Sequence, residues 1–252
     1  MKTPITPIKI FNTKGNQMNP ETPKDFLALH SQAKPFLIPN PWDVGSARIL
    51  QGLGFSALAT SSAGFAWSLG RADYGVTRDE ALTHARAIAT SVDIPVSADL
   101  ENGFGNHPDE VAQTITLAVQ TDLCGGSIED TTGRADAPNY NIKDAAKRIE
   151  AAVAAAQHAE RKFVLTARAD GLLHGVTDLN NIIERLHAFD AAGADVLFAP
   201  GLPDLDAVHQ VCAAVYKPVN VLVMGTLTQH SLADFAAAGV ARLSVGGRLA
   251  AN

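Results

Sequence analysis

Short apolar segments alternate with amphipathic segments along almost the whole chain. The apolar segments are hydrophobic at most positions rather than at every second one, which is typical of strands in a parallel sheet that is covered on its outer face. Eight such segments are expected to be strands, at residues 35–41, 56–62, 96–103, 125–130, 163–170, 196–201, 219–224 and 242–247.

Helical periodicity fills the intervals between these strands. Helix start signals support the pattern: Thr77 precedes an acidic first turn, Pro108 stands at a helix start, and Asp178 precedes another. The predicted helices cover residues 23–32, 46–53, 78–91, 108–121, 142–158, 178–192, 203–215 and 228–238.

Eight strands with seven intervening helices predict an α/β chain that folds as a single (β/α)8 TIM-type barrel. The barrel is predicted to be a catalytic domain over residues 21–252, preceded by a flexible N-terminal extension over residues 1–20. Few residues follow the eighth strand, so the usual final helix is missing from this sequence.

Composition agrees with one large domain and excludes some partners. The chain has 252 residues, and barrels of this type need about 250. Its formal net charge is −6 without a Lys/Arg cluster, which argues against a nucleic-acid partner or an anionic membrane. No apolar segment reaches the roughly 18 residues that a membrane span requires.

The two cysteines, Cys124 and Cys212, are not paired in a CxxC motif. This spacing argues against a disulfide scaffold or a structural zinc site and fits a reducing compartment. The polar N-terminus has no apolar signal core, so we expect a cytoplasmic protein.

Acidic residues stand where the predicted strands end. Asp99 and Glu101 end the third strand, Glu129 ends the fourth, and Asp73 lies in the loop after the second. Strand ends of a barrel meet at one mouth, and residues two apart on a strand face the same way. Converging carboxylates need a cation or protons between them, and oxygen ligands favour Mg²⁺, with Mn²⁺ as an alternative. A network of salt bridges that closes the barrel top is the other interpretation.

Two further features could hold an acidic substrate. Arg168, at the end of the fifth strand, could bind a substrate carboxylate with two parallel hydrogen bonds, or it could pair with Glu129 or Asp170. The segment 61–64 (SSAG) after the second strand could offer backbone N–H groups to an anion, although such clusters are often simple turns.

An ordered set of motifs resembles the isocitrate lyase/phosphoenolpyruvate mutase superfamily over about residues 35–247. The motifs are NPWD (40–43), TSSAG (60–64), LGRADYGVT (69–77), ADLENGFG (98–105), SIED (127–130) and TARAD (166–170).

The resemblance implies a Mg²⁺-dependent lyase-type enzyme for a small 2-oxo or 2-hydroxy carboxylic acid. The reaction would pass through a metal-stabilised enolate, with cleavage of a carbon–carbon bond or decarboxylation. The implied roles are metal binding for Asp99, Glu101 and Glu129, catalysis for Arg168, Glu129 and Asp73, and substrate binding for Ser61, Ser62, Ala63 and Arg168. The superfamily is typically tetrameric and exchanges its last helix, which implies a homo-oligomer although that helix is absent here.

The loop after the fourth strand departs from the pattern. Carbon–carbon lyases of the superfamily carry a Lys-Lys/Arg-Cys-Gly-His loop whose thiol is a general acid/base, whereas residues 131–138 read TTGRADAP, with Ala137 in place of the cysteine. The Lys-Thr-Asn-Ser stretch of the phosphonate mutases is also absent. Asp136, Asn139 or Tyr140 could substitute.

These departures argue against an authentic isocitrate or methylisocitrate lyase and leave two alternatives beside the lyase hypothesis. One is a phosphonopyruvate or phosphoenolpyruvate mutase or hydrolase that acts on a P–C bond. The other is a non-catalytic 2-oxo acid binding protein with a degenerate site.

Overall fold

The computed structural model describes residues 22–160 and 162–251, so the predicted N-terminal extension over residues 1–20 lies outside the described residues. The strands are β1 (Phe36–Ile38), β2 (Leu58–Ala59), β3 (Val96–Asp99), β4 (Gly125–Glu129), β5 (Val164–Arg168), β6 (Val196–Phe198), β7 (Val219–Leu222) and β8 (Arg242–Ser244). The α-helices are α1 (Thr22–Leu29), α2 (Val44–Gly52), α3 (Ser62–Ser68), α4 (Arg78–Ala89), α5 (Pro108–Ala118), α6 (Ile142–Gln157), α7 (Leu179–Ala191), α8 (Leu205–Ala214) and α9 (Leu232–Ala237). Three short 3₁₀ helices are η1 (Gly171–His174), η2 (Gly225–Gln229) and η3 (Gly246–Leu249).

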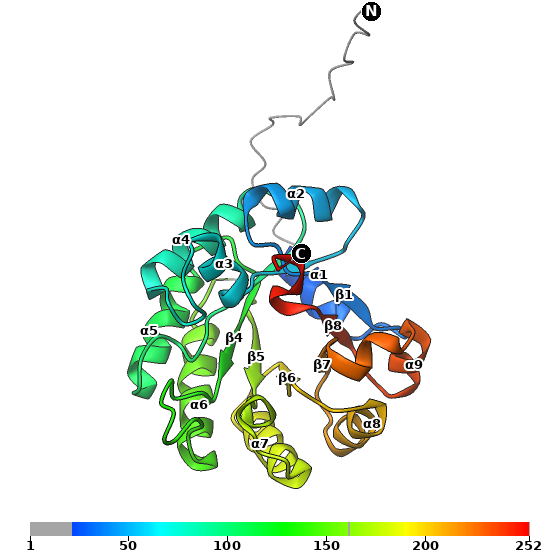
Figure 1. The fold of residues 1–252 in the computed structure, drawn as a ribbon. Coiled ribbons are helices and arrows are strands. Elements are labelled where there is room, and N and C mark those ends of the chain that lie inside the picture. Colours follow the sequence, from blue (N-terminus) through cyan, green and yellow to red (C-terminus); the bar gives the residue numbers. More distant parts are fainter. Residues whose placement is uncertain (1–21, 161, 252) are drawn as a thin grey trace, which may run out of the picture.

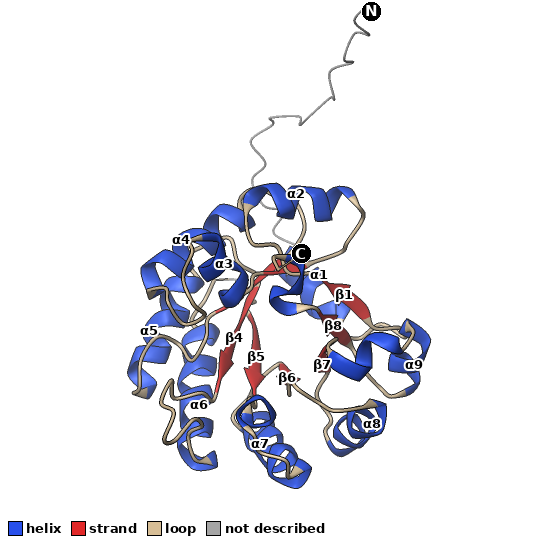
Figure 2. Cartoon of the chain, viewed as in Figure 1, coloured by secondary structure: helices blue, strands red, loops and turns tan. Residues whose placement is uncertain are grey.

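The eight strands are parallel and form one sheet in the order β1-β8-β7-β6-β5-β4-β3-β2. Because β1 pairs with β8, the sheet curls round until β1 and β2 face each other, and the helices lie on its outside (Figures 1 and 2). The predicted (β/α)8 TIM-type barrel is therefore confirmed, and each of its eight strands lies inside a predicted segment.

One side chain bridges the seam between β1 and β2. Since β2 has two residues, it forms no ladder with β1, and a single backbone bond joins Ala59 N to Pro39 O at 3.1 Å. The Asn40 amide donates to the carbonyls of Ala59 and Thr60 at 3.1 and 3.2 Å. Its carbonyl oxygen accepts from the backbone N–H groups of residues 245 and 246. Asn40 thus ties the ends of β1, β2 and β8 together.

Apolar side chains of the described residues form three clusters, of which a small one lies around Ala66, Val76 and Ala81 and the other two build the barrel. The larger cluster lies between the sheet and its helices and includes Ile88 of α4, Ile115 of α5 and Phe189 of α7, all fully buried. A smaller cluster joins Phe26 of α1 to strand residues such as Val196, so α1 covers the N-terminal end of the barrel. This closure leaves the opposite end, where the strands terminate, for chemistry.

Two helices differ from the sequence prediction. Helix α3 begins where the second strand was expected to end, because the Ser61 side chain accepts a hydrogen bond from Gly64 N at 3.2 Å and caps a helix. The predicted helix over residues 228–238 divides into η2 and α9. After β8 the described chain ends in η3, which packs against α3. None of the helices in the described ranges is both long and apolar enough to cross a bilayer.

A buried histidine makes the stability of the fold depend on pH. His30, just after α1, donates from Nδ1 to Phe26 O at 2.9 Å and accepts at Nε2 from Arg242 at 3.2 Å, so its ring is neutral. Burial and the Arg242 charge lower the pKa of His30 to about 3.

Below about pH 6.5 the unfolded chain therefore binds a proton at His30 that the folded chain does not bind. This group alone lowers the free energy of unfolding by about 1.4 kcal/mol per pH unit between pH 6 and 4. Urea unfolding across this range should show a shallower slope for His30→Gln than for the native chain. Equal slopes would refute this account.

Candidate active site

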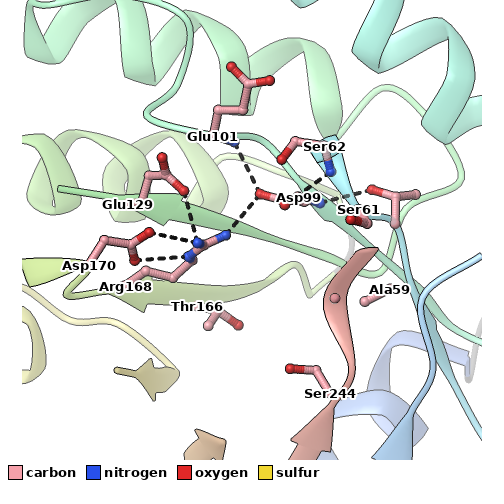
Figure 3. Close-up of polar contacts among 12 residues, drawn as sticks. Ala59, Ser61, Ser62, Asp99, Glu101, Glu129, Thr166, Arg168, Asp170 and Ser244 are labelled. Carbon is pink, nitrogen blue, oxygen red and sulfur yellow. Dashed lines mark hydrogen bonds and ion pairs between the residues drawn. The ribbon is translucent and has the colours of Figure 1, made fainter. Parts of the chain in front are cut away.

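A cavity of about 200 Å³ opens at the carboxyl ends of the strands and descends into the barrel. It collects most of the residues that the sequence singled out, and Figure 3 shows Asp99 and Arg168 side by side on its wall. The lining includes Asn40, Ser61, Ser62, Ala63, Asp73, Ser97, Asp99, Ser127, Arg168, Asn220, Arg242 and Ser244.

Asp99 is the last residue of β3 and the most heavily hydrogen-bonded acid of the cavity. Its Oδ2 accepts from Ser62 N at 3.2 Å, and its Oδ1 accepts from Glu101 N at 3.3 Å and from Arg168 Nη1 at 3.2 Å. Its own N–H donates to the Thr60 hydroxyl at 2.9 Å. The backbone at the start of α3, expected to receive a substrate anion, thus binds Asp99 through the Ser62 amide.

Arg168 lies at the centre of three carboxylates. It bonds both oxygens of Asp170, at 3.2 and 2.7 Å, and its Nη2 lies 3.1 Å from Glu129 Oε2 (Figure 3). With Asp99 as the third partner, these pairs confirm the ion-pair interpretation of Arg168. Burial alone would lower the pKa of Arg168, but Asp170, Glu129 and Asp99 outweigh it and raise the pKa above its ordinary value, so the guanidinium stays charged.

Beside its ion pair with Arg168, Glu129 accepts a hydrogen bond that the sequence did not suggest. It ends β4 opposite Arg168 in the register, and its Oε1 accepts from the Tyr74 hydroxyl at 2.5 Å. Tyr74 reaches it from the loop between α3 and α4, where its backbone takes a positive φ of 61°. Burial raises the pKa of Glu129 well above its ordinary value, against the opposing effect of Arg168.

Glu101 does not share the orientation of Asp99. Strand β3 ends at Asp99, and Glu101 takes a φ of +49°, so the alternation of a strand does not extend to it. Figure 3 shows its carboxylate directed away from Asp99, and it lines a small hollow with Phe65 and His84 that Asp99 also borders. Its Oε1 is buried and has no hydrogen-bond partner. Burial first, and then the charges of Asp99 and Asp73, raise the pKa of Glu101 to about 8.

Asp73 lies on the cavity wall, as the sequence predicted for the loop after the second strand. Burial and the neighbouring Asp99 raise its pKa, and a hydrogen bond from the Ser62 side chain opposes that rise. With Asp73, Asp99, Glu101, Glu129 and Asp170, acidic groups outnumber the Arg168 charge at this end of the cavity. Protons therefore offset part of the repulsion.

The structure does not gather Asp99, Glu101 and Glu129 into one direct ligand set, so the metal site stays a prediction in which Asp99 is the ligand and the other acids act through waters. Among the described side chains, no three acidic, histidine or cysteine groups are arranged so that they could hold a metal ion together. The reason lies in two features: Arg168 binds both Asp99 and Glu129, and the backbone turn at Glu101 directs that side chain away. Asp99 is the acid of this set that lines the main cavity.

The loop that departs from the superfamily pattern folds as a short hairpin. Thr131 and Asn139 form an antiparallel bridge, and Asp136 forms an exposed ion pair with Arg134. The Asn139 amide donates to Asp130, and the Tyr140 hydroxyl donates to Asn106 at 2.8 Å. None of the three candidate substitutes, Asp136, Asn139 and Tyr140, is among the described residues that line the cavity.

Polar residues on the inner wall of the barrel were missed from the sequence. Asn220 of β7 and Arg242 and Ser244 of β8 point into the barrel, and Asn220 donates to the Ser244 hydroxyl at 3.0 Å. The sequence did contain a signal for them, because each is a polar residue at an inward-facing position of a predicted strand that is otherwise apolar. Such positions usually hold branched apolar side chains in a barrel of this type.

Comparison with known proteins identifies the family. A family model described as phosphoenolpyruvate phosphomutase matches residues 26–252. The chain belongs to the isocitrate lyase/phosphoenolpyruvate mutase superfamily. It is 32% identical to 2-methylisocitrate lyase of Escherichia coli K12 over 228 residues, which cover 86% of this chain and 76% of the lyase.

Two solved structures from Burkholderia cenocepacia J2315 resemble this superfamily member closely. A proposed lyase/mutase is 50% identical with a TM-score of 0.89, and the match covers 92% of this chain and 83% of that one. A proposed phosphonomutase is 34% identical with a TM-score of 0.84, covering 91% and 94%. The superfamily resemblance inferred from the motifs is therefore confirmed, and the related proteins are described as lyases and mutases.

Proposed function

We propose that this protein is a Mg²⁺-dependent enzyme that acts on a small 2-oxo or 2-hydroxy carboxylic acid through an enolate, by cleaving a carbon–carbon bond or by decarboxylation. The observation that carries the proposal is the pair formed by Asp99 and Arg168, 3.2 Å apart on the wall of one cavity. A carboxylate beside a fixed cation can bind a metal ion and stabilise a developing oxyanion at the same place.

The acidic surroundings fit a divalent cation. Glu101 has an unpartnered buried oxygen, and Asp73 and Asp99 both line the cavity beside Arg168. Mg²⁺ usually keeps several waters and uses one or two carboxylates, so Asp99 alone could bind it directly. Glu101, Asp73 and Glu129 would then act through waters. Bound Mg²⁺ would supply Lewis-acid stabilisation of the substrate oxygen.

Other residues of the cavity would stabilise charge, position the substrate and transfer a proton. Arg168 is held by Asp170 and Glu129, so its charge stays fixed beside a ligand in the cavity and needs no rearrangement during the reaction. Ser61, Ser62 and Ala63 border the same cavity and would position the substrate carboxylate. Asp73 lies on the cavity wall, within reach of a bound acid, where it would transfer a proton.

Cleavage or transfer of a P–C bond at the same site is a second candidate. It is favoured by the name of the matching family model and by the loop after β4, which has Ala137 where the carbon–carbon lyases carry their thiol. The two candidates differ in their products. Phosphonopyruvate would release phosphate or form phosphoenolpyruvate under one hypothesis and would be unchanged under the other.

A turnover screen with and without Mg²⁺ tests the proposal. The panel consists of 2-oxo acids, 2-hydroxy diacids and phosphonopyruvate, and we expect turnover of a 2-oxo or 2-hydroxy acid that EDTA abolishes and Mg²⁺ or Mn²⁺ restores. Turnover that survives metal removal would contradict the metal role. Binding of 2-oxo acids by calorimetry without any turnover would instead support a non-catalytic binding protein. Self-association also remains a prediction, which sedimentation velocity checks.

A further inference from the structure

Arg242 is a buried cation on the floor of the cavity. It is the first residue of β8, is 5% exposed, and lines the same cavity as Asp99 and Arg168. Its guanidinium donates to Asn220 Oδ1 at 2.8 Å, to Thr166 Oγ1 at 3.1 Å and to His30 Nε2 at 3.2 Å. Burial lowers the pKa of Arg242 to about 9, so the group is still a cation at neutral pH.

All three of these partners are neutral. Among the described side chains, Arg242 forms no ion pair, whereas Arg168 pairs with three carboxylates. A buried charge without a counter-ion is costly, and a guanidinium has five N–H donors of which three are engaged here. Of the two arginines that line the cavity, Arg242 is therefore the one whose charge is uncompensated.

Small hydroxyl side chains line part of the cavity wall, beside apolar side chains such as Phe198 and Leu222. Ser97, Ser127 and Ser244 line the cavity, and Figure 3 shows Thr166 and Ser244 on facing sides of the space below Arg168. Barrel interiors of this kind are usually packed with branched apolar residues. Here the cavity extends from the mouth to Arg242, and its hydroxyl and guanidinium groups suit the polar ends of a ligand whose carbon chain contacts the apolar side chains.

We propose that Arg242 forms an anion subsite that binds a carboxylate at the far end of the ligand, so that the substrate is a diacid with one acid group at Asp99 and Arg168 and the other at the barrel floor. This inference rests on the proposed function for the placement of the first acid group. It adds a second recognition element that selects diacids over monoacids.

The spacing sets the length of the ligand. Thr166, which contacts Arg242, precedes Arg168 by two residues on β5, a rise of about 6.6 Å. An extended carbon chain covers roughly 1.2 Å per covalent bond, so about five bonds of a ligand would span the distance from the level of Arg168 to the level of Thr166. Diacids of about five carbons match this spacing.

Calorimetric binding with a matched pair of stable ligands tests the subsite. In Mg²⁺ buffer, 2-oxoglutarate carries a distal carboxylate, and 2-oxopentanoate has the same chain length without it. One charge-assisted contact should make the diacid bind about tenfold to a hundredfold more tightly. Arg242→Gln should remove this preference, and Arg242→Lys should retain part of it. Equal affinities in the native protein, or an unchanged preference in Arg242→Gln, would overturn the proposal.

A second variant keeps the test decisive if Arg242→Gln fails to fold. Ser127→Leu places an apolar side chain of the usual barrel type in the cavity wall and leaves Arg242 and its three partners intact. It should also abolish the preference for 2-oxoglutarate, and a retained preference would count against the subsite.

Inorganic phosphate distinguishes a substrate subsite from a site for a free anion. If phosphate stabilised the native protein but not Arg242→Gln, and the native protein showed no preference for the diacid, Arg242 would bind a free anion and the substrate assignment would be refuted. Diacid preference without turnover of any panel compound would refute the proposed function and leave the subsite standing.

Discussion

Asp99→Asn should lower Mg²⁺-dependent kcat/KM by at least about a thousandfold, which corresponds to about 4 kcal/mol of transition-state stabilisation. The substitution keeps the shape of the side chain and one oxygen that can accept from Ser62 N, so the barrel should fold. It removes the negative charge that we propose binds the ion. Steady-state kinetics over a range of Mg²⁺ concentrations measures the effect.

Asp79→Asn is the matched control for this experiment. Asp79 lies in the first turn of α4, and its carboxylate is exposed outside the cavity. Its replacement should leave kcat/KM and the Mg²⁺ dependence unchanged. If Asp99→Asn retained full turnover, the cavity acid would have no part in catalysis and the proposed function would fail.

Arg168→Met should destabilise the fold by about 3–5 kcal/mol at pH 7, because it leaves Asp99, Glu129 and Asp170 buried together without their cation. Urea unfolding at pH 7 provides the measurement. Arg134→Met is the control, since it removes an exposed ion pair with Asp136 and should leave the free energy of unfolding unchanged.

The loss of unfolding free energy in Arg168→Met, relative to the native protein, should become smaller as the pH falls toward about 4. Without the guanidinium, the effect of Arg168 no longer opposes the burial that raises the pKa of Glu129, so protonation of this carboxyl group favours the folded variant. Stability conferred by a raised carboxyl pKa is fully present below the unfolded pKa of about 4 and is lost as the pH rises through the folded pKa. A deficit that is constant between pH 7 and 4 would show that packing, not charge, explains the loss.

The sequence predicted the barrel because its strands are apolar at nearly every position. It also predicted which acids meet at the mouth, since the position of a residue at a strand end determines where its side chain begins. Asp99, Glu129 and Arg168 were placed together for this reason, and the structure brings them into contact.

Other features depend on tertiary geometry that no pattern in the chain encodes. Glu101 was expected to face the same way as Asp99. Strand β3 ends at Asp99, however, and the backbone then turns, with a positive φ at Glu101. Tyr74 reaches Glu129 across 55 positions of the sequence. Asn220 and Arg242 lay within apolar segments, where a single polar residue is easily assigned to the solvent side.

The seam between β1 and β2 also bears on how the protein avoids aggregation. Strands without a ladder partner on one side offer free N–H and C=O groups to other chains. In this barrel the two unladdered edges have three and two residues and face each other, and the Asn40 amide binds the carbonyls of Ala59 and Thr60 at that edge. An incompletely laddered barrel thus presents no extended edge on which a second chain could add a strand.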